Sequence, residues 1–243
     1  MLIELTINHA KELAKLQQKK YRVLNNKTIV EGLRLLDQLS DYGIKFDELI
    51  ISNKSEIDIS KYSAKHTFIA SQDKMKKITA TKTPQDIAAV IPIIPIPVNE
   101  TQFLLYLDGI SDPGNMGTIF RTATAAGVSG MILSPDCCEI YNPKVIRASL
   151  GSVFYLPSET HDHNWLQSLQ TTIIATTLKD STNLFELKKP TRLMLVIGSE
   201  AFGVSKEILQ LAQHKVKIPI PGNIESINAA VAAGIAIYHF IDK

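Results

Sequence analysis

The chain has 243 residues, of which 45% are hydrophobic and 21% charged, and its formal net charge at pH 7 is +2. This length allows one large or two small domains, and the composition is that of a globular protein with a sizeable core. No apolar run reaches the roughly 18 residues that a membrane-spanning helix needs without polar breaks, and the first residues show no signal-peptide pattern. We therefore expect a cytoplasmic protein without a membrane partner.

The first part of the chain is predicted to be a small α/β domain. Residues 1–99 hold 15 Lys and Arg against 11 Asp and Glu, a net charge of +4, whereas residues 100–243 hold 11 against 13. A mildly basic module suits contact with phosphates, and an ordinary solvated surface explains it equally well. The hydrophobic periodicity predicts helices at 8–20, 33–42 and 72–78, and strands near 27–30, 46–52, 66–70 and 87–91.

Three prolines follow within six residues, at Pro92, Pro95 and Pro97. Prolines at this density do not fit a central strand and favour an extended, semi-rigid conformation. Residues 92–102 are therefore predicted to be an interdomain linker.

The remainder alternates apolar strands with helices, which predicts an α/β domain with a parallel sheet. The final helix is expected to begin at Ser226 as its N-cap and, being apolar nearly all round, to be buried. Strands are predicted at 103–108, 130–134, 153–156, 171–176, 193–197 and 216–220, and helices at 116–126, 142–149, 161–170 and 226–243.

Three stretches of this second part, 104–127, 193–209 and 215–243, share one pattern: an apolar strand, a Gly-containing polar turn and a helix. In open parallel sheets, ligands bind where such turns gather at the carboxyl ends of the strands. Three turns in one domain therefore predict one composite site.

Taken in this order, the three stretches resemble the three motifs of the SpoU/TrmH-type RNA 2′-O-ribose methyltransferases of the SPOUT superfamily. Each motif alone is weak, and the three together are specific. The matching residues are Asn115, Gly117 and Arg121; Gly198, Glu200 and Gly203; and Pro219, Gly222, Ser226 and Asn228.

The resemblance implies a fold that spacing and composition do not predict. It implies a C-terminal SPOUT domain, residues 103–243, with a parallel sheet and a trefoil knot. Residues 1–91 resemble the family's L30e-like RNA substrate-binding domain, through Val30-Glu31-Gly32 and the Thr-rich stretch 78–91. It also implies a homodimer that forms through the C-terminal domain and completes the active site.

The resemblance implies methyl transfer from S-adenosylmethionine to a ribose 2′-hydroxyl, with Arg121, Asn115, Glu200 and Asn228 as the catalytic residues. A guanidinium group has no lone pair that accepts a proton readily. Its more economical role is to bind the adjacent phosphate and to stabilise the developing alkoxide, although the family's arginine is often described as the base. Both roles for Arg121 stay open.

The cofactor, S-adenosylmethionine, is expected to lie against backbone and apolar groups, which are typical of an adenosine pocket. The resemblance assigns this role to Gly198, Ile218, Ile227, Ser226 and Pro219. The family usually has Leu and Val where this chain has Ile227 and Ala229, a small apolar change that should preserve the pocket.

Arg121, Ser149, Lys82 and Glu31 are the candidate contacts to RNA, and each also has an ordinary structural explanation in a cap, turn or surface ion pair. No metal site is expected, since His161 and His163 lack a third ligand and the adjacent Cys137 and Cys138 have no ligand spacing. Ribosomal RNA is preferred over transfer RNA because the N-terminal domain resembles that of the ribosomal enzymes.

Two alternatives remain besides a transfer RNA methyltransferase. One is a non-catalytic RNA-binding protein of the same fold, which would lack the four catalytic residues. The other is a Rossmann-type nucleotide-binding enzyme, which would need a G-x-G-x-x-G turn that residues 108–117 do not supply.

Overall fold

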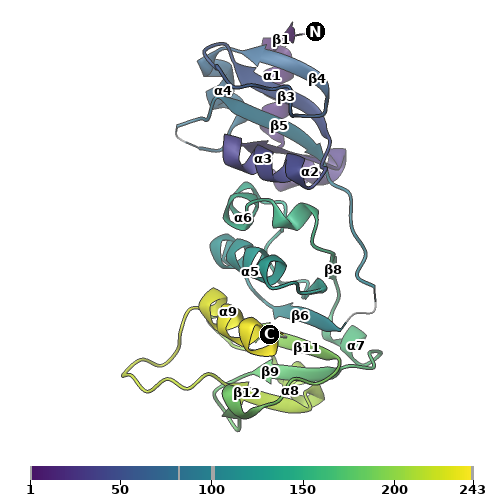
Figure 1. Cartoon of the computed structure of the whole chain (residues 1–243), viewed down its shortest axis with the longest axis vertical. Helices are drawn as coiled ribbons and strands as arrows, with labels where there is room; N and C mark the ends of the chain where they lie inside the picture. The colour runs from purple at the N-terminus through teal and green to yellow at the C-terminus, as the bar shows by residue number, and fades with distance from the viewer. Residues whose placement is uncertain (1, 82, 100–101, 242–243) are drawn as a thin grey trace. The chain divides into compact units, whose positions relative to one another are not determined.

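The computed structural model describes residues 2–81, 83–99 and 102–241. The chain separates into two compact units, each with its own sheet (Figure 1). The first unit comprises residues 1–94 and 141–155, and the second comprises residues 95–140 and 156–243. The first boundary falls inside the predicted Pro-rich linker, whereas residues 141–155, which the sequence places in the second domain, cluster with the first.

The first unit has a five-stranded mixed sheet in the order β1-β4-β3-β5-β2, in which β5 runs antiparallel to both neighbours. Apolar residues of α1 and α4 pack on it in a core that includes Leu13, Met75 and Ile50. The strands are β1 (Leu2–Glu4), β2 (Lys27–Glu31), β3 (Phe46–Ser52), β4 (Ala64–Ala70) and β5 (Ile87–Pro92); the helices are α1 (Ile7–Lys15), α2 (Lys19–Asn25), α3 (Leu33–Asp41), α4 (Gln72–Ile78) and α6 (Pro143–Ser149), with a 3-10 turn η1 (Ser152–Phe154).

The second unit has a seven-stranded sheet in the order β10-β12-β9-β11-β6-β7-β8, and all its strand pairs are parallel. The strands are β6 (Phe103–Asp108), β7 (Gly130–Leu133), β8 (Ser158–Thr160), β9 (Thr172–Thr176), β10 (Thr182–Asn183), β11 (Leu193–Gly198) and β12 (His214–Lys217); the helices are α5 (Pro113–Ala125), α7 (His163–Leu166), α8 (Lys206–Leu211) and α9 (Ala229–Phe240), with a 3-10 turn η2 (Leu184–Glu186).

Helices cover both faces of this sheet. α5 and α9 lie side by side in Figure 1 and are in contact. Leu166 of α7 and Ile208 of α8 share an apolar cluster with alternate residues of the central strands, such as Leu104 and Tyr106. The buried strands are continuous apolar runs because both of their faces pack against helices. The α/β class and the parallel sheet are thereby confirmed.

Several predicted elements were wrong in position or type. The predicted helix 8–20 is two helices, because the chain leaves the helical conformation before Lys19, at Gln18. Residues 153–156 were predicted as a strand, but Val153 and Phe154 belong to the 3-10 turn η1, and β8 begins later, at Ser158. The last helix begins at Ala229, three residues after Ser226, because the Asn228 side chain caps it by accepting from two backbone N–H groups.

Among the described residues, no helix combines the length and hydropathy that crossing a membrane requires.

Asp47 of β3 is a buried carboxylate held by two lysines. It is 7% exposed, and its oxygens lie 2.8 Å from Lys27 Nζ and 2.6 Å from Lys65 Nζ. Hydrogen bonds from these ammonium groups lower the pKa of Asp47 below its ordinary value. A lowered folded-state pKa contributes stability above the unfolded value of about 4, and this contribution is lost as the pH falls through the folded value.

We therefore predict that Asp47→Asn reduces the acid sensitivity of the first unit. Because both lysines are exposed enough for solvent screening, the contribution at neutral pH should be about 1 kcal/mol. Urea unfolding between pH 7 and pH 2 measures it, with the exposed Asp41→Asn as the matched control. A wild-type acid profile in Asp47→Asn would rule out this ion pair as a stabilising one.

Candidate functional site

The three polar turns of the second unit leave the sheet at one edge. β6, β11 and β12 belong to one parallel sheet, and Gly198 at the end of β11 lies in register with Asp108 at the end of β6. Parallel strands present their carboxyl ends at the same edge, so the loops after these strands converge there. The composite site that the sequence predicted has this geometric basis.

Asn115 joins the three turns by hydrogen bonds. Its side-chain nitrogen donates to Glu200 Oε1 in the turn after β11, and its side-chain oxygen accepts from Asn228 Nδ2 at 3.0 Å. Asn228 in turn accepts at its Oδ1 from the backbone N–H groups of Ala230 and Val231. One amide therefore links the start of α5, the Glu200 turn and the start of α9.

The start of α5 leaves the Asn115 side chain available for this role. Asp112 is the N-cap of the helix, and its Oδ1 accepts from the Asn115 backbone N–H at 2.9 Å. Pro113 occupies the first helical turn, where a missing N–H costs nothing. Because the Asp112 side chain already accepts a hydrogen bond from a free backbone N–H at the start of the helix, the Asn115 side chain is not needed as a cap.

Arg121 lies two turns further along α5 and is exposed. Within the described ranges 2–81, 83–99 and 102–241, its guanidinium makes no hydrogen bond or ion pair. Its planar fork of donors is therefore available to an anion such as a phosphate.

An open hollow of about 490 Å³ lies beside the third turn. Such a volume is in the range of small-molecule sites. Its lining is mostly apolar side chains and backbone, which suits a nucleoside, and includes the predicted cofactor residues Ile218 and Pro219. The lining residues are Leu178, Lys217, Ile218, Pro219, Ile220, Pro221, Ile224 and Glu225.

The other three predicted cofactor residues do not line this hollow. Ser226 and Asn228 precede α9, and Ser226 is exposed with Ile227 partly so. Gly198 faces its own chain: a Cβ built there would lie 2.1 Å from the backbone carbon of Gly203 and 2.2 Å from Val204 N. Glycine at 198 is thus required by the fold itself, a reason that the sequence pattern does not reveal.

Asp108 is a positioning residue that sequence reasoning missed. Its Oδ2 accepts from the Ser205 backbone N–H at 2.7 Å, which fixes the far end of the turn that carries Glu200. The available signal was an acidic residue at the carboxyl end of a buried strand. Such a residue finds backbone donors in the neighbouring turns.

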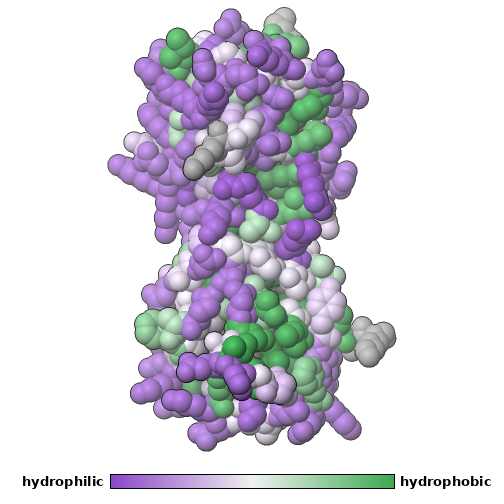
Figure 2. All heavy atoms as spheres, turned by 90° about the vertical axis from the view of Figure 1, so that its left-hand side faces the viewer, coloured by the Kyte–Doolittle hydropathy of each residue, from purple (hydrophilic) through white to green (hydrophobic). Residues whose placement is uncertain are grey.

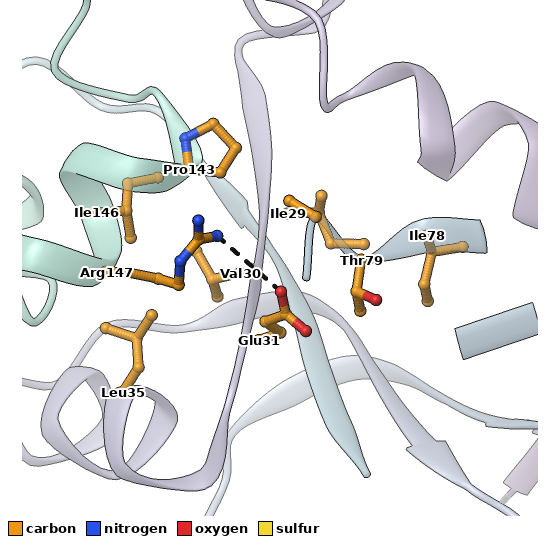
Figure 3. Close-up of a pocket in the computed structure, with 10 residues that line it drawn as sticks. Ile29, Val30, Glu31, Leu35, Ile78, Thr79, Pro143, Ile146 and Arg147 are labelled. Atoms are coloured by element: carbon orange, nitrogen blue, oxygen red, sulfur yellow. Dashed lines mark ion pairs between the residues drawn. The ribbon is translucent and has the colours of Figure 1, made fainter. Parts of the chain in front are cut away.

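The predicted RNA contacts in the first unit face inward. Ser149 is fully buried and donates to the Ile146 carbonyl. Glu31 is 7% exposed, and its Oε2 accepts from Thr81 Oγ1 at 2.9 Å, while its Oε1 lies 4.0 Å from Nη1 of Arg147. Figure 3 shows the Arg147 side chain pointing toward this carboxylate in a small, mostly apolar pocket. Lys82 lies outside the described residues.

Cys137 and Cys138 are free thiols beside the end of β6. Cys137 Sγ donates to the Leu107 carbonyl at 3.2 Å, and burial raises the pKa of both thiols, that of Cys138 to about 11. Both are therefore weak nucleophiles at neutral pH. Among the described residues, no group of three or more His, Cys, Asp or Glu side chains is arranged to hold a metal ion.

Comparison with known proteins gives consistent matches over nearly the whole chain. The model of the SpoU rRNA Methylase family matches residues 102–238, and that of the MRM3-like substrate binding domain matches residues 8–89. The 23S rRNA (guanosine(2553)-2′-O)-methyltransferase RlmP of Bacillus subtilis (strain 168) is 30% identical over 234 residues, 94% of each chain.

Two further matches are informative. The 23S rRNA (uridine(2479)-2′-O)-methyltransferase of Streptomyces viridochromogenes is 31% identical over 156 residues, 60% of this chain and 54% of that protein. The crystal structure of an AdoMet-bound rRNA methyltransferase from Sinorhizobium meliloti superposes with a TM-score of 0.85 at 27% identity, covering 98% of this chain and 97% of the other.

The contact at Gly198 gives a testable prediction. Gly198→Ala should destabilise the second unit by about 3 kcal/mol or more, because backbone rather than a flexible side chain occupies the space. Gly222→Ala is the matched control, since nothing lies within 4 Å of a Cβ placed there. Urea unfolding of both variants measures the difference, and equal stability of the two would contradict the close approach.

Proposed function

The chain belongs to the SpoU rRNA methylase family, and on that premise we propose that it transfers a methyl group from S-adenosylmethionine to a ribose 2′-hydroxyl of 23S ribosomal RNA. The observation that carries the proposal is the hydrogen-bonded set Asn115, Glu200 and Asn228, which holds three strand-end turns together. The same unit also has an exposed arginine on α5, which can bind an RNA phosphate, and a nucleoside-sized hollow, which can hold the cofactor.

S-adenosylmethionine supplies an activated methyl group on its sulfonium, so the protein's task is mainly to position the two reactants. Ile218 and Pro219 are proposed to hold its adenosine part in the hollow. The predicted contacts of Gly198, Ser226 and Ile227 with the cofactor remain part of the proposal, through backbone atoms of the same turns.

Arg121 is proposed to bind the phosphate next to the target ribose and to stabilise the oxyanion that develops at its 2′-oxygen. Glu200 and Asn228 are proposed to contact the ribose or the cofactor. Within the described part of the chain, the Glu200 carboxylate bonds only to Asn115, so it retains acceptor capacity for a substrate hydroxyl. Asn115 orients both of these side chains.

The choice of RNA rests on the relatives. Two of them are named as 23S rRNA methyltransferases, but one modifies a guanosine and the other a uridine. The RNA class is therefore carried over to this chain, and the nucleotide is not. The first unit is proposed to bind the RNA, since residues 8–89 match a substrate-binding domain. A cytoplasmic location is part of the same proposal.

The finer features of the fold also belong to the proposal. They are the L30e-like character of residues 1–91, the linker role of residues 92–102, the SPOUT domain at 103–243 and its trefoil knot. The all-parallel sheet and the match of the SpoU rRNA Methylase family model to residues 102–238 support the SPOUT domain, and the knot is inferred from that family membership.

We further propose a homodimer through α9. Val231 and Tyr238 are two turns apart on one side of this helix, and each is 53% exposed. In the space-filling view, apolar residues gather in a patch on the second unit, on the side from which the loop before α9 projects (Figures 1 and 2). An apolar stripe on an otherwise packed helix is typical of a subunit interface.

The proposed function predicts that the wild type incorporates label from S-adenosylmethionine into unmodified 23S rRNA transcript, and far less into transfer RNA. Arg121→Ala should lose about 10²- to 10³-fold in kcat, because an oxyanion contact is removed. Arg121→Lys should lose most of this rate as well, because the fork geometry is lost.

The readout is alkali-resistant label, which reports 2′-O-methylation, together with calorimetric binding of the cofactor. Label in base positions would contradict the proposed chemistry, and a fully active Arg121→Ala would remove the arginine from the mechanism. Cofactor binding without label in any RNA would favour the non-catalytic alternative.

The dimer proposal predicts that Tyr238→Glu is monomeric at micromolar concentration, because a charge cannot be buried unpaired in an apolar interface. Light scattering coupled to gel filtration measures the mass. Ile7→Glu is the control, since Ile7 is 64% exposed in the first unit. A monomeric wild type would refute the dimer.

A further inference from the structure

Phe202 is the most exposed of the large apolar side chains in the described residues, at 92%. It lies in the turn between β11 and α8, two residues after Glu200. A phenylalanine gains nothing from water and normally buries most of its ring. Full exposure on a turn that belongs to the candidate site therefore points to a ligand that covers the ring.

The turn that carries Phe202 is held by its own hydrogen bonds. The Phe202 backbone N–H donates to Ser199 Oγ at 3.2 Å, and the Gly203 N–H donates to the Ser199 carbonyl at 2.9 Å. Gly203 adopts a left-handed conformation (φ +68°), which few side chains tolerate. The turn is thus fixed at both ends, and ordering it costs little when a ligand binds.

The residues next to Phe202 in the chain are small or polar. They are Ala201 and Gly203, preceded by Glu200, whose carboxylate is bonded to Asn115. Protein interfaces form from contiguous apolar surface, which α9 offers and this turn does not. A lone aromatic ring amid polar groups is instead characteristic of a stacking contact with a nucleobase.

The cofactor is a less suitable occupant. The hollow with nucleoside dimensions is formed by residues 217–225 and Leu178, and Phe202 is not part of its lining. A base attached to the target ribose, or its immediate neighbour in the RNA, is the remaining aromatic group that must approach Glu200 during the reaction.

We propose that Phe202 stacks on an unpaired base of the substrate RNA at or next to the methylated nucleotide. This inference rests on the proposed function and names one contact by which the site takes RNA. Because the ring contacts any base through its face, it contributes affinity and orientation without reading the base.

The test compares Phe202→Ala, Phe202→Leu and Phe202→Tyr with the full-length wild-type protein. The probe is unmodified 23S rRNA transcript. Filter binding in the presence of S-adenosylhomocysteine gives the RNA affinity without requiring methyl transfer, so failure of this proposal is distinguishable from failure of the proposed activity. Phe185→Ala is the matched control, a 55% exposed phenylalanine of the same unit outside the three turns.

We expect Phe202→Ala to weaken RNA binding by about 5- to 150-fold, the range found for one stacked base. Phe202→Leu should lose nearly as much, because it keeps apolar area without a π face, and Phe202→Tyr and Phe185→Ala should bind as the wild type does. The salt dependence of binding should be unchanged, since no charge is removed. Affinity for S-adenosylmethionine and the oligomeric mass should also stay the same.

Three results would overturn the proposal. RNA affinity unchanged in Phe202→Ala, or retained in Phe202→Leu, would show that no stacking occurs. A change of mass in Phe202→Ala would assign the ring to a contact between two copies of the chain. A selective loss of S-adenosylmethionine affinity would assign it to the cofactor.

Discussion

The side-chain amide of Asn115 is the interaction on which the candidate site depends. Its nitrogen donates to Glu200 and its oxygen accepts from Asn228, so two turns that lie 85 and 113 residues further along the chain are tied to the start of α5. An amide is suited to this position because it offers a donor and an acceptor on one planar group. A carboxylate there would repel Glu200, and a hydroxyl would span less distance.

The hydrogen bonds of Asn115 depend on a fixed backbone in the turns that they join. Parallel pairing brings the ends of β6 and β11 into register, and Asp108 holds the Ser205 N–H so that the intervening turn cannot swing away. At Gly198 the backbone of Gly203 and Val204, in the same turn, lies so close that no side chain fits. Positioning dominates a methyl transfer, so in the proposed function the rigidity of these turns would serve the reaction as well as the fold.

Much of the fold follows from the sequence pattern alone. The strands 46–52 and 103–108 were predicted at their observed bounds. For 103–108 the reason is that both faces of the strand are buried, which leaves a nearly unbroken hydrophobic run. Short edge strands such as β1 and β8 carry no such run, and pairing with a neighbour is what makes them strands. The start of the last helix was misplaced because Ser226 and Asn228 are both good caps, and tertiary contact with Asn115 selects the second.

The site was less accessible to sequence reasoning. The four polar residues were identified through the family resemblance, and nothing in their spacing gives the bonds among Asn115, Glu200 and Asn228. Asp108 and the packing at Gly198 depend on which turns meet in space, which no local pattern encodes. The inward orientation of Glu31 likewise depends on Thr81 and Arg147, at distant positions in the chain.

A crystal structure of the protein with S-adenosylhomocysteine would test the proposed site most directly. We expect the adenosine in the hollow lined by Ile218 and Pro219, with the sulfur directed toward the Asn115–Glu200–Asn228 cluster and with Arg121 close to the space beside the sulfur. An adenosine bound elsewhere, or a cluster pulled apart to admit it, would contradict the claim that these three turns form a preorganised methyl-transfer site.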